Sequence, residues 1–254
     1  MKLVRYRFAQ ETGYGAVIEG KVHRLEAGPW RPQQPGEALA PLDQVELLAP
    51  CQPTKILAVG RNYAAHAAEH DAPVPDEPLL FLKPPNSVIG PGEAIVYPEH
   101  LSQQVEHEAE LAVVIGRRAR FVPRDGALDY VLGYTCANDV TARDLQRRDS
   151  QWARAKGFDT FCPLGPWIIT DLDVRDLSVC CRVNGELRQQ GRTREMIFSV
   201  PELIAYISAV MTLEPGDVLL TGTPAGVNPL LPGDRVSVEI EGIGTLWNEV
   251  VRDE

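Results

Sequence analysis

Two carboxylates stand two residues apart at the start of an apolar run, a spacing that suits metal binding. Glu108 and Glu110 lead into residues 111–116, LAVVIG, which carry no charge. On a β-strand such residues point to the same face, about 7 Å apart. Like charges that are partly buried side by side are costly unless a cation lies between them. Oxygen ligands favour Mg2+, Mn2+ or Ca2+ over zinc. A solvated strand end is the alternative interpretation.

A third acid follows a second predicted strand. Residues 133–137, GYTCA, run into a segment where we expect a helix to start, with Asn138, Asp139 and Thr141 at its first positions. A simple N-cap is the alternative role for Asp139. Arg143 and Gln146 then lie one turn further on, near Asp139, where they can bind an anionic substrate.

Three further segments carry polar groups that chemistry can use. Lys156 precedes Gly-Phe-Asp-Thr and a Pro-rich turn, where an exposed loop lysine is the alternative. A buried strand ends in the Gly-rich loop at 221–226, whose backbone amides could hold a carboxylate or simply form a tight turn. His66 and Glu69 share one face of an Ala-rich helix, so Glu69 can orient His66 as a base. A purely structural histidine is the alternative there.

The elements that must position these groups are mostly strands. We expect a buried strand at 55–60, a helix at 61–70 because of its alanines, and a mobile loop at 71–78, where three prolines and three acids gather. Asn184-Gly185 predicts a hairpin. Ser199 and Glu202 have capping-box spacing at the start of a helix over 199–212. Strands do not alternate with helices, which disfavours a doubly wound sheet or a TIM barrel.

The whole chain has the balance of a globular protein. Its 254 residues suffice for a domain at 51–254 and a small N-terminal domain at 1–50. A net charge of −10 argues against nucleic-acid and anionic-membrane partners. No apolar run reaches the roughly 20 residues of a membrane span, and the N-terminus lacks a signal-peptide core, so we expect a cytoplasmic protein. Five cysteines without a CxxC pair indicate buried free thiols rather than a structural zinc site.

The order of these motifs resembles the fumarylacetoacetate hydrolase family over about residues 55–250. The matching motifs are GRNYxxHxxE at 60–69, ExE at 108–110, NDxxxRDxQ at 138–146, KGFDT at 156–160 and TGTP at 221–224. The first 50 residues resemble the small, variable domain that often precedes the catalytic one. Glu106-His107 departs from the common Asp-Tyr, and Thr141 replaces a frequent serine. Both changes can alter metal seating or pocket shape.

The resemblance implies a mostly β roll with a few helices, of the β-sandwich type, assembled as a homodimer. It also implies a Mg2+ ion, or Mn2+ or Ca2+ in its place. The positions that match the family's site are Glu108, Glu110 and Asp139 as metal ligands, Lys156 beside the metal, Arg143, Gln146, Gly222 and Thr223 toward the substrate, and His66 with Glu69 as the lid dyad that activates water.

The implied activity is hydrolysis of a C–C bond in a 2,4-dioxo acid, giving pyruvate or a related oxo acid and a carboxylic acid. The oxo acid's carboxylate and 2-oxo group chelate the metal, which stabilises the enolate. The same chelate serves decarboxylation and enol–keto isomerisation of the kind found in aromatic catabolism, on 5-carboxymethyl-2-oxohex-3-ene-1,7-dioate or 2-hydroxyhepta-2,4-dienedioate. These reactions remain alternatives, as does a non-catalytic metal-binding scaffold.

Overall fold

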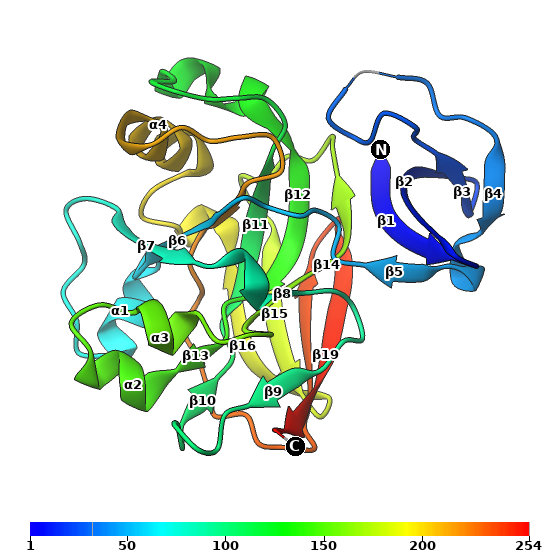
Figure 1. Ribbon diagram of the computed structural model, residues 1–254. Helices are drawn as coiled ribbons and strands as arrows, with labels where there is room; N and C mark the ends of the chain where they lie inside the picture. The colour runs from blue at the N-terminus through cyan, green and yellow to red at the C-terminus, as the bar shows by residue number, and fades with distance from the viewer. Residues whose placement is uncertain (32, 254) are drawn as a thin grey trace.

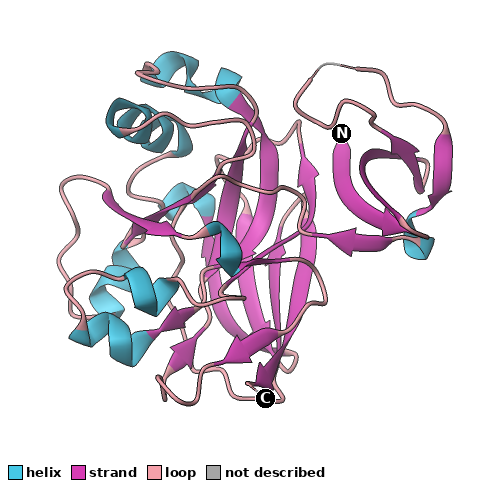
Figure 2. Cartoon of the chain, in the orientation of Figure 1, coloured by secondary structure: helices cyan, strands magenta, loops and turns pink. Residues whose placement is uncertain are grey.

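The computed structural model describes residues 1–31 and 33–253, and most of its regular structure is β (Figures 1 and 2). This confirms the predicted class, mostly strands with a few helices. The larger sheet has the strand order β4 (Ala38–Pro41), β3 (Lys21–Arg24), β2 (Glu11–Ile18), β1 (Lys2–Phe8), β14 (Cys162–Ile169), β12 (Val131–Asn138), β11 (Ala109–Ile115), β17 (Val218–Leu220), β6 (Ile56–Gly60) and β7 (Leu79–Lys83), with β5 (Glu46–Leu48) paired to β1 and β8 (Val88–Ile89) to β14.

A second sheet packs against the middle of the first. Its strand order is β16 (Glu186–Arg192), β15 (Ser178–Val183), β18 (Arg235–Ile240), β19 (Gly244–Arg252) and β9 (Ile95–Tyr97). A short ribbon pairs β10 (Val105–Glu106) with β13 (Thr141–Ala142). The helices are α1 (Ala64–Glu69), α2 (Arg143–Arg148), α3 (Ala153–Lys156) and α4 (Val200–Val210), with 3₁₀ turns η1 (Leu42–Gln44), η2 (Pro85–Ser87), η3 (Arg124–Tyr130) and η4 (Thr193–Glu195).

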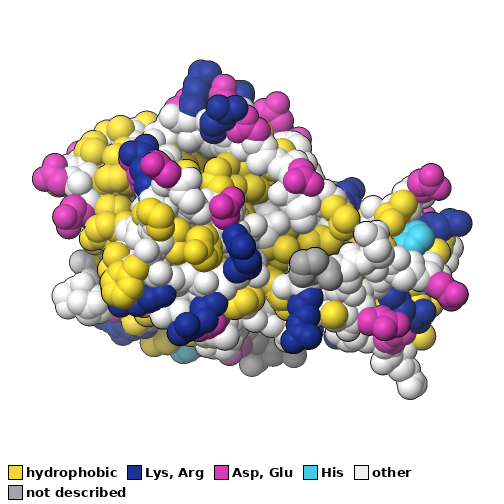
Figure 3. Space-filling view, turned by 90° about the horizontal axis from the view of Figure 1, so that it is seen from above, with side chains coloured by type: hydrophobic (Ala, Val, Ile, Leu, Met, Phe, Trp, Pro, Cys, Tyr) yellow, Lys and Arg dark blue, Asp and Glu magenta, His cyan; other side chains and the backbone are white. Residues whose placement is uncertain are grey.

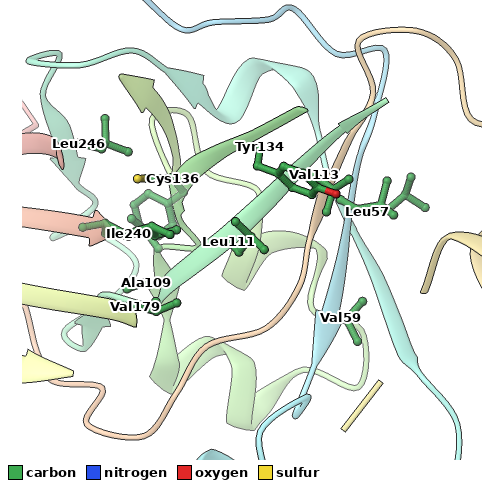
Figure 4. Packing of buried hydrophobic residues seen from close by; sticks show 14 of the residues in the cluster. Leu57, Val59, Ala109, Leu111, Val113, Tyr134, Cys136, Val179, Ile240 and Leu246 are labelled. Atoms are coloured by element: carbon green, nitrogen blue, oxygen red, sulfur yellow. The ribbon is translucent and has the colours of Figure 1, made fainter. Parts of the chain in front are cut away.

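Strand β11 is apolar on both faces because both faces are covered. Leu111 and Val113 point into the core between the sheets, together with residues of β15, β18 and β19 (Figure 4). Ala112 and Val114 pack into a second cluster on the opposite face. A strand covered on both faces reads as a continuous apolar run rather than an alternating one. The period of two also places Glu110 on the same face as Ala112 and Val114.

The N-terminal unit extends the large sheet. β1 pairs with β14 through Lys2–Ile169 and Leu3–Ile168, and β1 to β4 curl round a small core of their own, built on Val4, Tyr6 and Val22. Figure 1 shows this unit beside the rest of the molecule, at the right. The domain boundary predicted at residue 50 remains a proposal.

Two local predictions are confirmed. Asn184 and Gly185 join β15 to β16 with φ angles of 53° and 84°, the left-handed pair that a tight hairpin turn requires. Helix α4 follows Ser199, whose backbone N–H donates to the Glu202 carboxylate at 2.8 Å. The five cysteines are free, and all but Cys180 are buried, as expected. Among the described residues, no helix has the length and apolar character to cross a membrane.

Candidate metal centre and the cavity around it

Two antiparallel strands bring the three predicted ligands together. Glu108 and Glu110 flank Ala109, the first residue of β11, and Ala109 pairs with Asn138, the last residue of β12. Asp139 follows directly, and its backbone N–H donates to the Glu108 carbonyl at 2.8 Å. One oxygen of each of the three carboxylates lies within 4.8 Å of the others. All three side chains are buried, so a solvated strand end does not describe this site.

Three cations contact two of these carboxylates. Lys156 Nζ, from α3, lies 2.8 Å from Glu108 Oε2 and 2.6 Å from Asp139 Oδ2. Lys83 Nζ, at the end of β7, is 2.6 Å from Asp139 Oδ1 and donates to the Val140 carbonyl at 3.2 Å. Arg143 forms an ion pair with Glu108. Lys156 is therefore a buried member of the cluster rather than an exposed loop lysine.

Glu110 differs from Glu108 and Asp139 because no lysine or arginine among the described residues forms an ion pair with it. Its carboxylate accepts the Gly222 N–H at 2.6 Å. Burial and the charges of Asp139 and Glu108 raise its pKa well above the usual value. Burial also acts to raise the pKa of Glu108, but Lys156 and Arg143 outweigh it and hold that pKa well below the usual value. A buried carboxylate among like charges and without a cation fits the place of a bound divalent ion.

All three guanidinium nitrogens of Arg143 contact other side chains of the protein. Nε donates to Glu106 at 2.7 Å, one Nη contacts Glu108, and the other donates to Gln146 Oε1 at 2.5 Å. Arg143 and Gln146 both line the cavity, and their predicted contact with a substrate remains a proposal. Glu106, which stands where Asp is common, is thus the buried acid that anchors Arg143.

The predicted helix start at residues 138–141 is wrong. Asn138 ends β12, Thr141 belongs to β13, and α2 begins at Arg143. Thr141 pairs with Glu106 across the short ribbon, so its backbone is extended. Asp139 therefore caps no helix, and its carboxylate faces two lysines. Local propensity favoured a cap, but pairing with a distant strand determined the conformation.

The loop after β17 holds a carboxylate of the protein itself. Gly222 has φ +93°, and a Cβ there would lie 2.7 Å from the Asn62 Cβ, so glycine is required for the close approach. The Thr223 hydroxyl donates to the Ala109 carbonyl at 2.8 Å and accepts from Gln189 at 2.7 Å. The Gly222 amide is thus bonded to Glu110 of the protein itself, and the predicted contact of Gly222 and Thr223 with the substrate remains a proposal.

His66 and Glu69 lie together on α1, and His66 lines the same cavity. His66 Nδ1 is 3.4 Å from Glu69 Oε2, and the Glu69 carboxylate accepts the Gly226 N–H at 3.0 Å. Burial lowers the pKa of His66 below its usual value, although Glu108 opposes this shift. The imidazole is therefore neutral near pH 7, the form in which it can accept a proton.

The cavity between these groups is small, about 60 Å³. Phe81 and Trp152 form an apolar wall with ring centroids 5.3 Å apart, and Arg61 and His70 complete the lining. Lys83, Gln189 and this aromatic wall were not predicted from the sequence. Lys83 could have been predicted, because a lysine at the end of the apolar run LLFLK is expected to be partly buried. Gln189 and Trp152 gave none, because tertiary packing alone brings them to the site.

Comparisons with known proteins agree with this geometry. The family model described as fumarylacetoacetate (FAA) hydrolase C-terminal matches residues 55–251, and one described as Rv2993c-like, N-terminal matches residues 1–50. Human mitochondrial oxaloacetate tautomerase FAHD2A is 46% identical over 83% of this chain and 71% of its own length.

Solved structures that are similar to the chain over its whole length include an isomerase and a hydrolase. The structure of 2-hydroxyhepta-2,4-diene-1,7-dioate isomerase from Mycobacterium marinum has a TM-score of 0.92 and 44% identity, over 100% of this chain and 99% of its own. Maleylpyruvate hydrolase from Sphingobium sp. SYK-6, solved with manganese(II) and pyruvate, has a TM-score of 0.83 and 33% identity over 100% of both chains.

Proposed function

The chain belongs to the fumarylacetoacetate hydrolase family, and from that premise we propose that it is a divalent-metal-dependent enzyme that interconverts the enol and keto forms of a small 2-oxo diacid. Glu108, Glu110 and Asp139 are the proposed ligands, for Mg2+ or Mn2+. The bound ion would polarise the 2-oxo group and lower the barrier to enolisation. This reaction moves a proton between oxygen and carbon and leaves the composition of the substrate unchanged.

The observation that carries this choice is the size of the cavity. An engineered cavity of about 150 Å³ holds one benzene molecule, and the space beside the three carboxylates is smaller, about 60 Å³. A four-carbon diacid requires this space to open somewhat, and a long dienedioate requires it to open much more, so the small space favours the shorter substrate. The similarity to an oxaloacetate tautomerase supports a four-carbon diacid. Arg61, which lines the cavity, provides positive charge for its second carboxylate.

Each proposed catalytic residue has a contact that fits its role. Lys156 Nζ lies between Glu108 and Asp139, where its charge stabilises negative charge on a nearby substrate oxygen. The contact of His66 Nδ1 with Glu69 orients the ring and leaves Nε2 to move the proton. Glu69 is tied to Gly226, so the dyad is coupled to the loop that also carries Gly222 and Thr223.

Hydrolysis of a 2,4-dioxo acid is the second candidate. The same dyad can take a proton from water, which then attacks the distal carbonyl and releases a carboxylic acid. The similarity to maleylpyruvate hydrolase favours this reading. It requires space for both substrate and water, hence a cavity that opens further than 60 Å³.

Product analysis separates the candidates. With Mg2+ or Mn2+, loss of enol absorbance from oxaloacetate above the protein-free rate, with no change of mass, would support isomerisation. Release of CO2 would indicate decarboxylation, and pyruvate released from an acylpyruvate would indicate hydrolysis. A chelator should abolish the reaction. No turnover of any 2-oxo or 2,4-dioxo acid would leave the non-catalytic scaffold as the better description.

We also propose that the protein is a homodimer. Large apolar side chains are exposed on and near η3 and α4, among them Phe121, Leu128 and Val210. Figure 3 shows apolar side chains gathered on the face seen from above. Light scattering after size exclusion tests this, and a monomer at all concentrations would contradict it.

A further inference from the structure

A second group of potential metal ligands includes two histidines, His66 and His70, that line the same cavity. His66, Glu69 and His70 occupy positions i, i+3 and i+4 at the end of α1, so they share one helical face. One ligand atom of each lies within 4.8 Å of the others. The two imidazole rings meet edge to face, with centroids 4.7 Å apart and planes at 84°.

His70 adds a feature that the proposed reaction does not explain. Its Nε2 is buried and has no hydrogen-bond partner among the described residues. A buried polar nitrogen without a partner costs free energy, and such groups in native proteins call for an explanation such as an ion. His70 lines the same cavity as His66 and follows the last residue of α1.

The chemistry of these ligands differs from that of the carboxylate cluster. Two imidazoles and one carboxylate are a common zinc set, whereas Mg2+ prefers oxygen ligands alone. We propose that His66, Glu69 and His70 form a second metal site that takes Zn2+ or a similar transition-metal ion. Its nitrogen ligands would disfavour Mg2+, whereas the neighbouring carboxylate cluster favours Mg2+.

The protonation state of the two imidazole rings is compatible with this geometry. Burial lowers the pKa of both His66 and His70, with the charge of Arg143 acting in the same direction on each. Neutral imidazoles need lose no proton before they bind a metal. The required movement is small, because zinc–nitrogen bonds of about 2.0–2.1 Å bring ligand atoms closer than 4.8 Å. Rotation of the two rings and of the half-exposed Glu69 side chain can supply it.

An ion at this site would inhibit the enzyme. If the proposed function holds, His66 and Glu69 move the proton, and a zinc ion bound to both side chains would hold the imidazole and the carboxylate out of that role. Since Zn2+ would sit on nitrogen ligands, added Mg2+ would not displace it. Inhibition by zinc would then be non-competitive with Mg2+.

The first test measures binding without any substrate. The full chain, loaded with excess Mg2+, is titrated with Zn2+ by calorimetry, and with Co2+ to observe the absorption of a nitrogen-containing, low-coordinate site. We expect one Zn2+ per chain. His70→Gln should weaken binding by at least about 100-fold, beyond the 10–100-fold that follows loss of an outer-shell partner. His100→Gln, at an exposed histidine elsewhere, is the matched control and should bind as the native chain does.

A second variant excludes zinc binding at the carboxylates. Glu110→Gln removes a ligand of the proposed Mg2+ site and should retain the zinc affinity. Equal zinc binding by His70→Gln and the native chain would overturn the proposal, as would loss of zinc binding in Glu110→Gln or displacement of zinc by Mg2+. Because binding needs no turnover, zinc binding without activity would refute the proposed function alone, and activity without zinc binding would refute the second site alone.

Discussion

The carboxylate cluster and the α1 dyad face the same cavity but are held in different ways. Glu108, Glu110 and Asp139 sit on β11 and directly after β12, two buried strands of the large sheet. His66 and Glu69 sit on a helix of six residues that is followed by an exposed Pro-rich loop. The first group has its geometry set by strand register, and the second depends on a short helix and one bond to Gly226. Chelation should therefore be the constant part of the chemistry, and proton transfer the variable part.

The largest effect should come from Glu110→Gln, which keeps the shape of the side chain and removes its charge. Loss of the metal's contribution, several kcal/mol, corresponds to about 10³-fold in kcat/KM. Calorimetry should show weaker Mg2+ binding. Full activity without added metal would contradict the assignment of this cluster.

A smaller effect is expected from His66→Ala. Loss of a general acid–base group should lower kcat by about 10²-fold, the lower end of the range typical of such groups. The affinity for Mg2+ should stay close to that of the native chain, because His66 is not one of its proposed ligands. If Mg2+ binding were lost in this variant, the two regions would not be separable and the comparison would fail.

The dependence of kcat/KM on pH tests whether His66 is the base, and the expected change in kcat/KM is smaller still. Since burial lowers the pKa of His66, its neutral form persists below the ordinary value of 6.5. With saturating Mg2+, kcat/KM should stay level as pH falls from 8 through 6.5, then drop about tenfold per pH unit below the lowered pKa. A decline that begins above pH 7 would show that another group is the base.

The sequence predicted the carboxylate pair at the start of β11 better than it predicted the residues that contact the cluster. Alternation along β11 placed Glu108 and Glu110 on one face, because a period of two is a local property. The helix start at Asp139 was wrong, because pairing of Thr141 with Glu106 is not local. Lys83 and Gln189 reach the site from segments 56 and 50 residues from Asp139, distances over which no periodicity carries information. The family resemblance supplied the roles that spacing alone left open.

The smallest expected effect is on the stability of the metal-free protein. It tests whether repulsion between Glu110 and the neighbouring carboxylates destabilises the folded state. The pKa of Glu110 is raised in the folded protein, so the folded state holds this proton more tightly than the unfolded chain. Stability contributed by the protonated form is present below the unfolded pKa, near 4.5, and is lost as pH rises through the folded pKa.

Glu110→Gln lacks that titration. In chelator, the variant should therefore have the higher Tm at pH 7, by a few degrees at about 2–4 °C per kcal/mol. The difference should shrink as pH falls toward 5, and Mg2+ should reverse it by stabilising only the native chain. Calorimetry across this range measures both. A variant that is less stable than the native chain at pH 7 without metal would mean that Lys156 and Lys83 already neutralise the cluster, and that it needs no ion for its charge.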